Sequence, residues 1–188
     1  MTRGHLPVPR PEYGAGMAHL VPLDGVHPEI DPTAFVASTA TLIGDVRIGA
    51  RTGVFYGAVV RGDLAPIRIG SGTNLQDNVV VHADPDFPAT IGDGVTVGHA
   101  AVVHGCTVED GCLIGMSATV MNGAVIGAGS LVAAGALVLE GTVVPPHSLV
   151  AGVPAKVRRE LTDDEIAGLE GSASRYAEIS RRHRGAAS

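Results

Sequence analysis

The sequence predicts an all-β solenoid, in which a parallel β-helix is followed by a C-terminal α-helix packed along it. Aliphatic residues recur every six positions over most of the chain, and many of them are followed by glycine or another small residue. Aromatic residues make up only 3% of the composition, which indicates a narrow core. A helix requires apolar spacings of three and four, and an ordinary strand requires two, so neither explains a period of six. The 188 residues leave room for one extended solenoid with a short appendage.

Each hexapeptide is expected to supply one short strand and one tight corner, with three hexapeptides to a turn. The register breaks in three places. Three extra residues lie around Asp63 to Pro66, four lie around Asp84 to Pro88, and one residue is missing between Val97 and Val102. Extra residues in a solenoid emerge as loops, and such loops often carry function. The period-six positions are Val36, Leu42, Ile48, Val54, Val60, Ile69, Leu75, Val81, Ile91, Val97, Val102, Val108, Ile114, Val120, Ile126, Val132, Val138 and Val144.

Three segments follow from this pattern. Pro145-Pro146 ends the regular coil, and Thr162 with Glu165 forms a capping box that marks the start of a helix. The helix carries a stripe of residues at three-and-four spacing, namely Ile166, Leu169, Ala173, Tyr176 and Ile179. The predicted segments are an irregular lead-in over 1–33, a β-helix over 34–152, and an exit turn with the C-terminal helix over 153–188.

Charge and composition exclude several classes of function. A net charge of −6 leaves no general basic surface, so nucleic acid is not an expected partner. No secretory signal pattern and no long apolar run occurs, so we expect no membrane contact and a cytoplasmic protein. Cys106 and Cys112 are six residues apart, on successive sides of the coil, so we expect structural thiols and no disulfide between them.

The coil register predicts which side chains stack. One edge of the coil is expected to carry the column Arg61, His82, His104, Asn122. Neighbouring coils lie about 4.8 Å apart, so His82 and His104 can share one metal ion. The remaining histidines are expected to be solvated or hydrogen-bonded surface residues: His5, His19, His27, His147 and His183.

His99 falls on the adjacent edge, in a predicted column with Tyr56, Gln76 and Met116. Five extended residues span about 16 Å, so His99 cannot join the other two histidines within one chain. A third ligand would have to come from another copy, which predicts a homotrimer with three interface sites. Three neutral imidazoles and a water form the open tetrahedral sphere typical of catalytic Zn²⁺, although Fe²⁺ and Co²⁺ accept imidazole as well.

A set of polar motifs is distributed along the repeat. They are Arg61-Gly62-Asp63, Thr73-Asn74-Leu75-Gln76-Asp77, Val81-His82, Val97-Gly98-His99 and His104-Gly105-Cys106. Together they resemble the signature of the gamma-class carbonic anhydrases and their bacterial relatives. The resemblance runs from about Thr33 to Arg159, and it implies a left-handed coil.

By this resemblance, the metal ligands are His82, His99 and His104. Arg61 and Asp63 match a pair that ties subunits together, and the residues that organise the site and its water are Asn74, Gln76 and Asp77. Tyr56 joins these candidates because it shares the predicted edge of Gln76 and His99. The implied reaction is hydration of carbon dioxide to bicarbonate by a metal-bound hydroxide. Arg61 and Asp77 could equally form an ion pair that has only a structural role.

One departure from the family bears on the rate. The best-known active members carry a glutamate just after the Arg-Gly-Asp run and an acidic loop. Here Leu64 follows Asp63, and the loop is the short Asp84-Pro85-Asp86-Phe87-Pro88. Fast hydration is therefore not predicted. Asp84 and Asp86 are the acids available to relay protons, although solvated surface carboxylates are the simpler expectation.

Three other functions remain open on the sequence. A hexapeptide acyltransferase would use one histidine as a general base, and Val153-Pro154-Ala155-Lys156 resembles that family too. Such an enzyme has no need for three histidines in metal-compatible columns. A metal-dependent thioesterase could use the same hydroxide on a thioester carbonyl, and a catalytically silent metal-binding relative is the third alternative.

Overall fold

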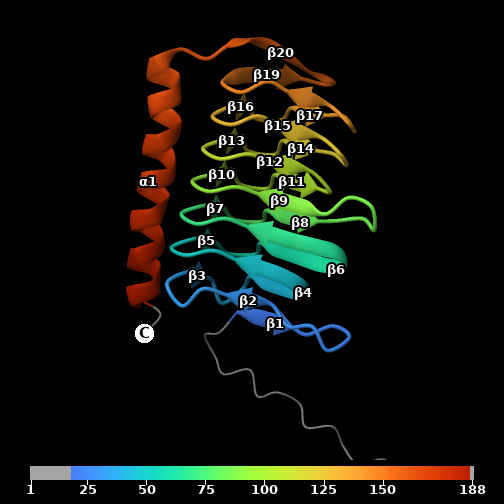
Figure 1. The fold of residues 1–188 in the computed structure, drawn as a ribbon. Coiled ribbons are helices and arrows are strands. Elements are labelled where there is room, and N and C mark those ends of the chain that lie inside the picture. The colour runs from blue at the N-terminus through green and yellow to red at the C-terminus, as the bar shows by residue number, and fades with distance from the viewer. Residues whose placement is uncertain (1–17, 187–188) are drawn as a thin grey trace, which may run out of the picture.

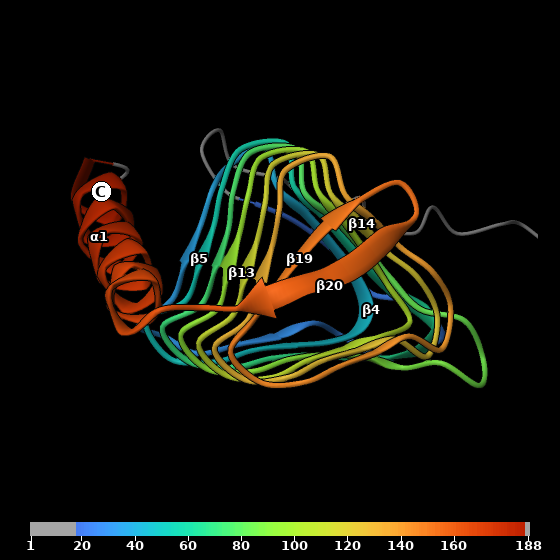
Figure 2. The ribbon, with the colours of Figure 1, turned by 90° about the horizontal axis from the view of Figure 1, so that it is seen from above.

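The structure, a computed structural model, describes residues 18–186 and consists of a parallel β-helix with one long helix beside it (Figure 1). Seen from the C-terminal end, the coils are triangular, and the chain turns clockwise as it advances toward the viewer (Figure 2). The coil is therefore left-handed, and the predicted fold class is confirmed.

The strands form three faces. The first face consists of β1 (His19–Val21), the N-terminal halves of β4 (Thr41–Ile48) and β6 (Val59–Ile69), β8 (Val80–His82), β11 (Val102–His104), β14 (Thr119–Val120) and β17 (Leu137–Val138). The second face consists of β2 (Glu29–Ile30), the C-terminal halves of β4 and β6, β9 (Ala89–Ile91), β12 (Thr107–Val108), β15 (Val125–Ile126) and β18 (Val143–Val144). The third face consists of β3 (Phe35–Val36), β5 (Gly53–Val54), β7 (Asn74–Leu75), β10 (Thr96–Val97), β13 (Leu113–Ile114), β16 (Leu131–Val132) and β19 (Ser148–Gly152).

The period-six residues point into the coil and form its core. Leu42, Leu75 and Ile114 are completely buried, as are most of their counterparts on the three faces. Each coil is hydrogen-bonded only to the coils next to it, so the core is a stack of thin aliphatic layers.

One register prediction is wrong. The residue that points inward on β11 is Val103, which is fully buried and pairs with Val81, whereas Val102 is partly exposed on the outer surface. No residue is therefore missing after Val97, and the coil is instead one residue short between Val103 and Val108. The two predicted insertions are present. The second of them, closed by an Asp84–Phe87 bridge, projects from the corner between the first and second faces (Figure 2).

The ends of the solenoid are more regular than the sequence indicated. Within the predicted lead-in, β1 and β2 pair in parallel with β4, while residues 1–17 of that segment lie outside the described residues, His5 among them. The predicted exit turn continues into β20 (Ala155–Glu160), which pairs antiparallel with β19. This hairpin places a layer over the last coil (Figure 2).

The helix α1 (Asp163–Ala186) runs back along the solenoid over the third face (Figure 1). The predicted capping box is present, because Thr162 N donates to Glu165 Oε2 at 2.9 Å and Glu165 N donates to Thr162 Oγ1 at 3.3 Å. Leu169 and Ala173 are buried against the strands, and Tyr176 packs edge-on against Phe55 with ring centroids 5.5 Å apart. The helix thus leaves the first face uncovered. Across residues 18–186, no helix combines the length and apolar character that crossing a membrane would require.

Truncating one core layer should destabilise the whole stack. Leu75→Ala removes a fully buried side chain and should lower the free energy of unfolding by about 2–5 kcal/mol. Urea denaturation followed by circular dichroism measures this loss. The control Val143→Ala removes a side chain that is 70% exposed and should change stability by no more than about 0.5 kcal/mol. Equal losses for the two variants would contradict the assigned core.

The two cysteines are free and buried. Burial raises the pKa of the Cys106 thiol to about 12 and that of Cys112 to about 11. Because the thiolate is the reactive form, neither residue should react with a disulfide reagent in the folded protein near neutral pH. Both should react once guanidinium chloride unfolds the chain. Rapid labelling of the native protein would show that this part of the core is open.

Candidate metal centre

Two predicted ligands, His82 and His104, lie one above the other on the first face. Parallel pairing of β8 with β11 places the two residues opposite one another, directly after the buried Val81 and Val103. The His82 Nδ1 and His104 Nε2 atoms are 2.9 Å apart, and the rings meet edge to face. Rigid backbone pairing therefore points one nitrogen of each imidazole at a common position.

The other nitrogen of His82 contacts a carboxylate. His82 Nε2 lies 3.0 Å from Asp63 Oδ1, and the second oxygen of Asp63 is bound by Arg61. Partial burial alone would raise the pKa of the Asp63 carboxyl, but hydrogen bonds from Arg61 and His82 outweigh burial and hold this pKa below its usual range. An ionised carboxylate only accepts hydrogen bonds, so His82 Nε2 carries the proton and Nδ1 presents a lone pair.

The outer nitrogen of His104 contacts an amide. His104 Nδ1 lies 2.6 Å from Asn122 Oδ1, and Asn122 Nδ2 donates to Asp84 Oδ2 at 2.8 Å. Backbone pairing continues from Val103 to Val120, so Met121 is the residue opposite His104, and Asn122 reaches it through its side chain. The predicted column thus holds for Arg61, His82 and His104, but it is wrong by one residue at Asn122.

Ligand atoms of His82, Asp84 and His104 lie within 4.8 Å of one another, and in the described part of the chain they form the one group of three that could hold a metal ion. The third predicted ligand, His99, is not part of this group. It follows β10 at the corner between the third and first faces and is about half exposed.

His99 has a carboxylate partner of its own. His99 Nδ1 lies 3.0 Å from Asp77 Oδ2, and Asp77 Oδ1 accepts a hydrogen bond from the Tyr56 backbone N at 3.2 Å. In register, Asp77 lies in the column with Tyr56 and His99, where the sequence placed Gln76. That prediction was wrong by one residue.

Gln76 and Asn74 are buried beneath this corner. Gln76 Oε1 accepts a hydrogen bond from the His99 backbone N at 3.2 Å, and Gln76 Nε2 donates to Asn74 Oδ1 at 3.3 Å. Asn74 Nδ2 in turn donates to Thr96 Oγ1 at 3.0 Å. These two amides hold the backbone that carries His99. Asp77 bonds His99, not Arg61, which is paired with Asp63.

Tyr56 belongs to a different cluster. Its hydroxyl lies 2.9 Å from His183 Nδ1 at the end of α1, and both rings pack near Phe35. Tyr56 therefore links the helix to the corner that carries His99. His183 is hydrogen-bonded and partly exposed, in line with the expectation for histidines outside the site.

Sequence reasoning missed the bonded roles of Asp84 and Asn122. Two signals were available: Asp84 begins the four-residue insertion, and the spacing of eighteen residues placed Asn122 in the column of His104, although this coil is one residue short and Met121 lies opposite His104. Neither signal gives the direction in which a side chain bonds.

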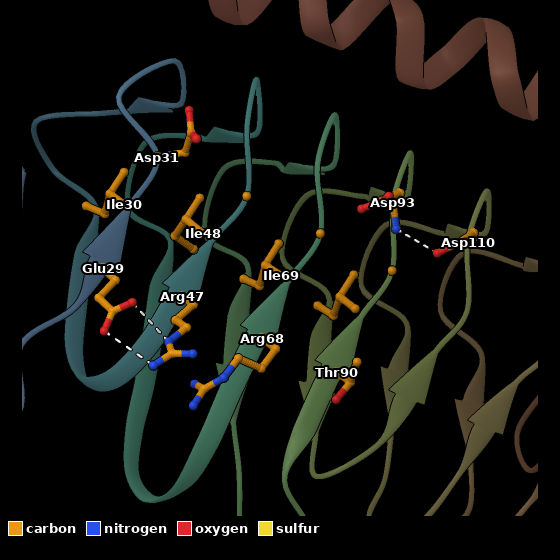
Figure 3. A pocket seen from close by; sticks show the side chains of 14 residues that line it. Glu29, Ile30, Asp31, Arg47, Ile48, Arg68, Ile69, Thr90, Asp93 and Asp110 are labelled. Carbon is orange, nitrogen blue, oxygen red and sulfur yellow. Dashed lines mark hydrogen bonds and ion pairs between the residues drawn. The ribbon is translucent and has the colours of Figure 1, made fainter.

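The second face carries a separate hollow (Figure 3). Its outward side chains include Glu29, Arg47 and Arg68, and its far edge is formed by Asp93 and Asp110. Glu29 is paired with Arg47 at 3.0 Å, and Arg68 is paired with Asp45 at 2.7 Å. None of the candidate site residues lines this hollow.

Comparisons with known proteins agree with the fold and the motifs. A family model for the bacterial transferase hexapeptide (six repeats) matches residues 105–140. The chain is similar to gamma carbonic anhydrase 1, mitochondrial, of Arabidopsis thaliana, with 47% identity over 162 residues that make up 83% of this chain. The match spans 59% of the length of that plant relative.

Two further similarities cover nearly whole proteins. A carbonic anhydrase of Geobacillus kaustophilus is 45% identical over 159 residues, which are 85% of this chain and 87% of the relative. The crystal structure of a hexapeptide transferase family protein from Anaplasma phagocytophilum superimposes with a TM-score of 0.84 and 45% identity, covering 87% of this chain and 96% of that one. On its repeat, its polar motifs and these identities, the chain belongs to the gamma-class carbonic anhydrase family of hexapeptide-repeat β-helix proteins.

Proposed function

We propose that this protein is a gamma-type carbonic anhydrase, a metal-dependent lyase that hydrates carbon dioxide to bicarbonate at a site between subunits. The observation that carries this proposal is the convergence of His82 Nδ1 and His104 Nε2 at 2.9 Å, with an oxygen partner on the outer nitrogen of each ring. Neutral imidazoles held in this way are the donors of catalytic zinc sites, and Fe²⁺ and Co²⁺ accept the same donors.

The third ligand is His99 of a neighbouring copy. Asp77 engages the Nδ1 atom of His99, which leaves Nε2 to face outward from a corner of the coil. Each copy thus offers a pair of imidazoles in one place and a single imidazole in another. A closed three-fold assembly brings the single imidazole of one copy to the pair of the next.

The outer surface of the first face suits such contact. Its outward side chains around the histidine pair are largely apolar, with Val80 exposed by 38% and Leu139 by 46%. The second face presents the paired charges of Glu29, Arg47 and Arg68 instead. Covering the apolar face with another copy would bury this surface and exclude water from around the histidines.

Residues around the proposed site have different roles in the reaction. A bound zinc ion would supply hydroxide near neutral pH, because it lowers the pKa of its water to about 7. Asp63 and Asp77 hold His82 and His99 in the tautomers that donate a lone pair. Gln76 and Asn74 fix the backbone at His99. Leu64, which is 52% exposed, stands directly after Asp63, at the position where an acidic side chain could pass protons to solvent. Because leucine cannot transfer protons, we expect slow hydration.

A transferase reading has support from the hexapeptide family model and from the transferase relative of known structure. A general base in acyl transfer needs one histidine with a free nitrogen toward its substrate. Here the inner nitrogens of two histidines face each other, an arrangement that suits a shared metal ion better than a single general base.

Metal-dependent thioester hydrolysis and a silent metal-binding role would use the same imidazole donors, so activity assays must separate them from hydration. Location in the cytoplasm stays a prediction from the sequence.

Loss of one ligand should abolish both metal binding and hydration. Wild type should retain one divalent ion per chain after dialysis, and His104→Ala should bind it at least about 100-fold more weakly. Elemental analysis and stopped-flow carbon dioxide hydration measure the two effects. The control His27→Ala changes an exposed histidine and should behave as wild type. If the wild-type protein holds its ion but hydrates no carbon dioxide, the proposed reaction is wrong, and the remaining candidate functions are metal-dependent thioester hydrolysis and silent metal binding.

The shared site predicts complementation between defective chains. His82→Ala and His99→Ala should each lose the metal, but unfolding and refolding them together should restore about a quarter of the sites, because one interface in four then joins two intact halves. Metal content and hydration rate report the recovery. Mixing His82→Ala with His104→Ala is the matched control and should restore nothing, since both changes damage the same half. If His99→Ala alone keeps its ion, Asp84 is the third ligand and the interface model is wrong.

A further inference from the structure

Asp84, Asn122 and His104 form a chain of two hydrogen bonds that ends at the proposed metal position. Asn122 Nδ2 donates to Asp84 Oδ2 at 2.8 Å, and Asn122 Oδ1 lies 2.6 Å from His104 Nδ1. All three side chains are partly buried. The chain joins the loop that projects at the corner to the next two coils.

The direction of these bonds follows from the amide. Asn122 Nδ2 donates to a carboxylate oxygen of Asp84, which fixes the amide with its NH₂ group toward Asp84. The amide oxygen must then face His104, and it too can only accept. The proton of neutral His104 therefore lies on Nδ1, and Nε2 presents its lone pair toward His82.

Asp63 imposes the complementary choice on His82, whose Nε2 atom it engages. The two rings thus bond outward through opposite nitrogens and direct Nδ1 of His82 and Nε2 of His104 inward. The 2.9 Å contact between these inner nitrogens is a hydrogen bond that needs a proton on one of them, and a cation bound by both lone pairs would take the place of that proton. The outer partners therefore prepare the pair for a metal ion.

The insertion at residues 84–88 holds Asp84 in place. Phe87 packs against the next coils, where a Cβ added at Gly105 would lie 2.7 Å from Phe87 Cβ and one at Gly123 would lie 3.2 Å from the Phe87 ring. A side chain at Gly105 would also overlap Asn122 Oδ1. The glycines leave room for both the loop anchor and the amide.

We propose that Asp84 and Asn122 are positioning residues that fix the metal-binding tautomer of His104. This inference rests on the proposed metal site. It gives the loop insertion a task other than proton transfer to solvent, because the Asp84 oxygen that bonds Asn122 is committed to holding the amide.

The test compares three variants for metal affinity, measured by competition for Zn²⁺ with a chromophoric chelator. Asn122→Leu removes the acceptor at His104 and should weaken binding about 10–100-fold. Asp84→Ala frees the amide to turn its NH₂ group toward His104, and a loss of about 10-fold is expected. Asp86→Ala, on the exposed tip of the same loop, is the matched control and should bind as wild type.

A reciprocal exchange separates positioning from simple anchoring of the loop. In the double variant Asp84→Asn with Asn122→Asp, the carboxylate at position 122 accepts from His104 as the amide oxygen did. The bond between positions 84 and 122 is kept with its direction reversed, since the amide at 84 now donates to the carboxylate at 122. Its affinity should return to within about threefold of wild type. In zinc-loaded protein, ¹⁵N NMR should show the His104 proton on Nδ1 in wild type and in the exchange variant, with a changed imidazole signature in Asn122→Leu.

The inference is overturned if Asn122→Leu lowers the melting temperature but leaves zinc affinity and the imidazole spectrum unchanged, or if the exchange variant is no better than Asn122→Leu. These readouts do not depend on catalysis. A protein that shows the expected affinity pattern yet hydrates no carbon dioxide would refute the proposed reaction and keep the positioning role. If the wild-type protein hydrates carbon dioxide but Asn122→Leu leaves zinc affinity unchanged, the positioning role is refuted and the proposed reaction is kept.

Discussion

Parallel hydrogen bonding between successive coils is the constraint on which the rest of the structure depends. Each strand pairs with the strand one coil above and one coil below, so a residue's height and direction are fixed by its position in the hexapeptide. This pairing places His82 over Arg61 and His104 over His82. The geometry of the paired imidazoles is thus a property of the backbone ladder, and buried valines on their inner side keep the ladder in register.

The coil departs from its period at the places where the histidines need partners. Asp63 lies in the first insertion and Asp84 begins the second, one coil later. Extra residues let the chain leave the surface and turn a carboxylate back toward it. The regular hexapeptides supply the other two acceptors, Asp77 for His99 and Asn122 for His104. The insertions thus add the Asp63 carboxylate beside His82 and, through Asp84, a partner that fixes the amide of Asn122.

The period of six predicted the β-helix, the core and the stacking of His82 on His104, because inward and outward positions alternate with little freedom. It could not choose between adjacent valines, so Val102 was taken for the inward Val103. The same one-residue ambiguity exchanged Gln76 for Asp77 beside His99. The hairpin strand β20 lies beyond the repeat and has no periodic signal. Bonds such as Asn122 to Asp84 join residues of different coils through side chains, and spacing gives only their proximity.

The three candidate ligands share one arrangement, in that an oxygen from their own chain engages one ring nitrogen of each. For His82 and His99 the oxygen is a carboxylate, and for His104 it is an amide backed by Asp84. If carboxylates contacted all three imidazoles directly, three negative charges would gather around a half-buried site. Arg61 offsets only the charge of Asp63. Placing Asn122 between Asp84 and His104 keeps an acceptor on His104 while the Asp84 carboxylate makes its hydrogen bond to the amide. The amide thus transmits the orienting effect of a carboxylate without direct contact between that carboxylate and the His104 ring.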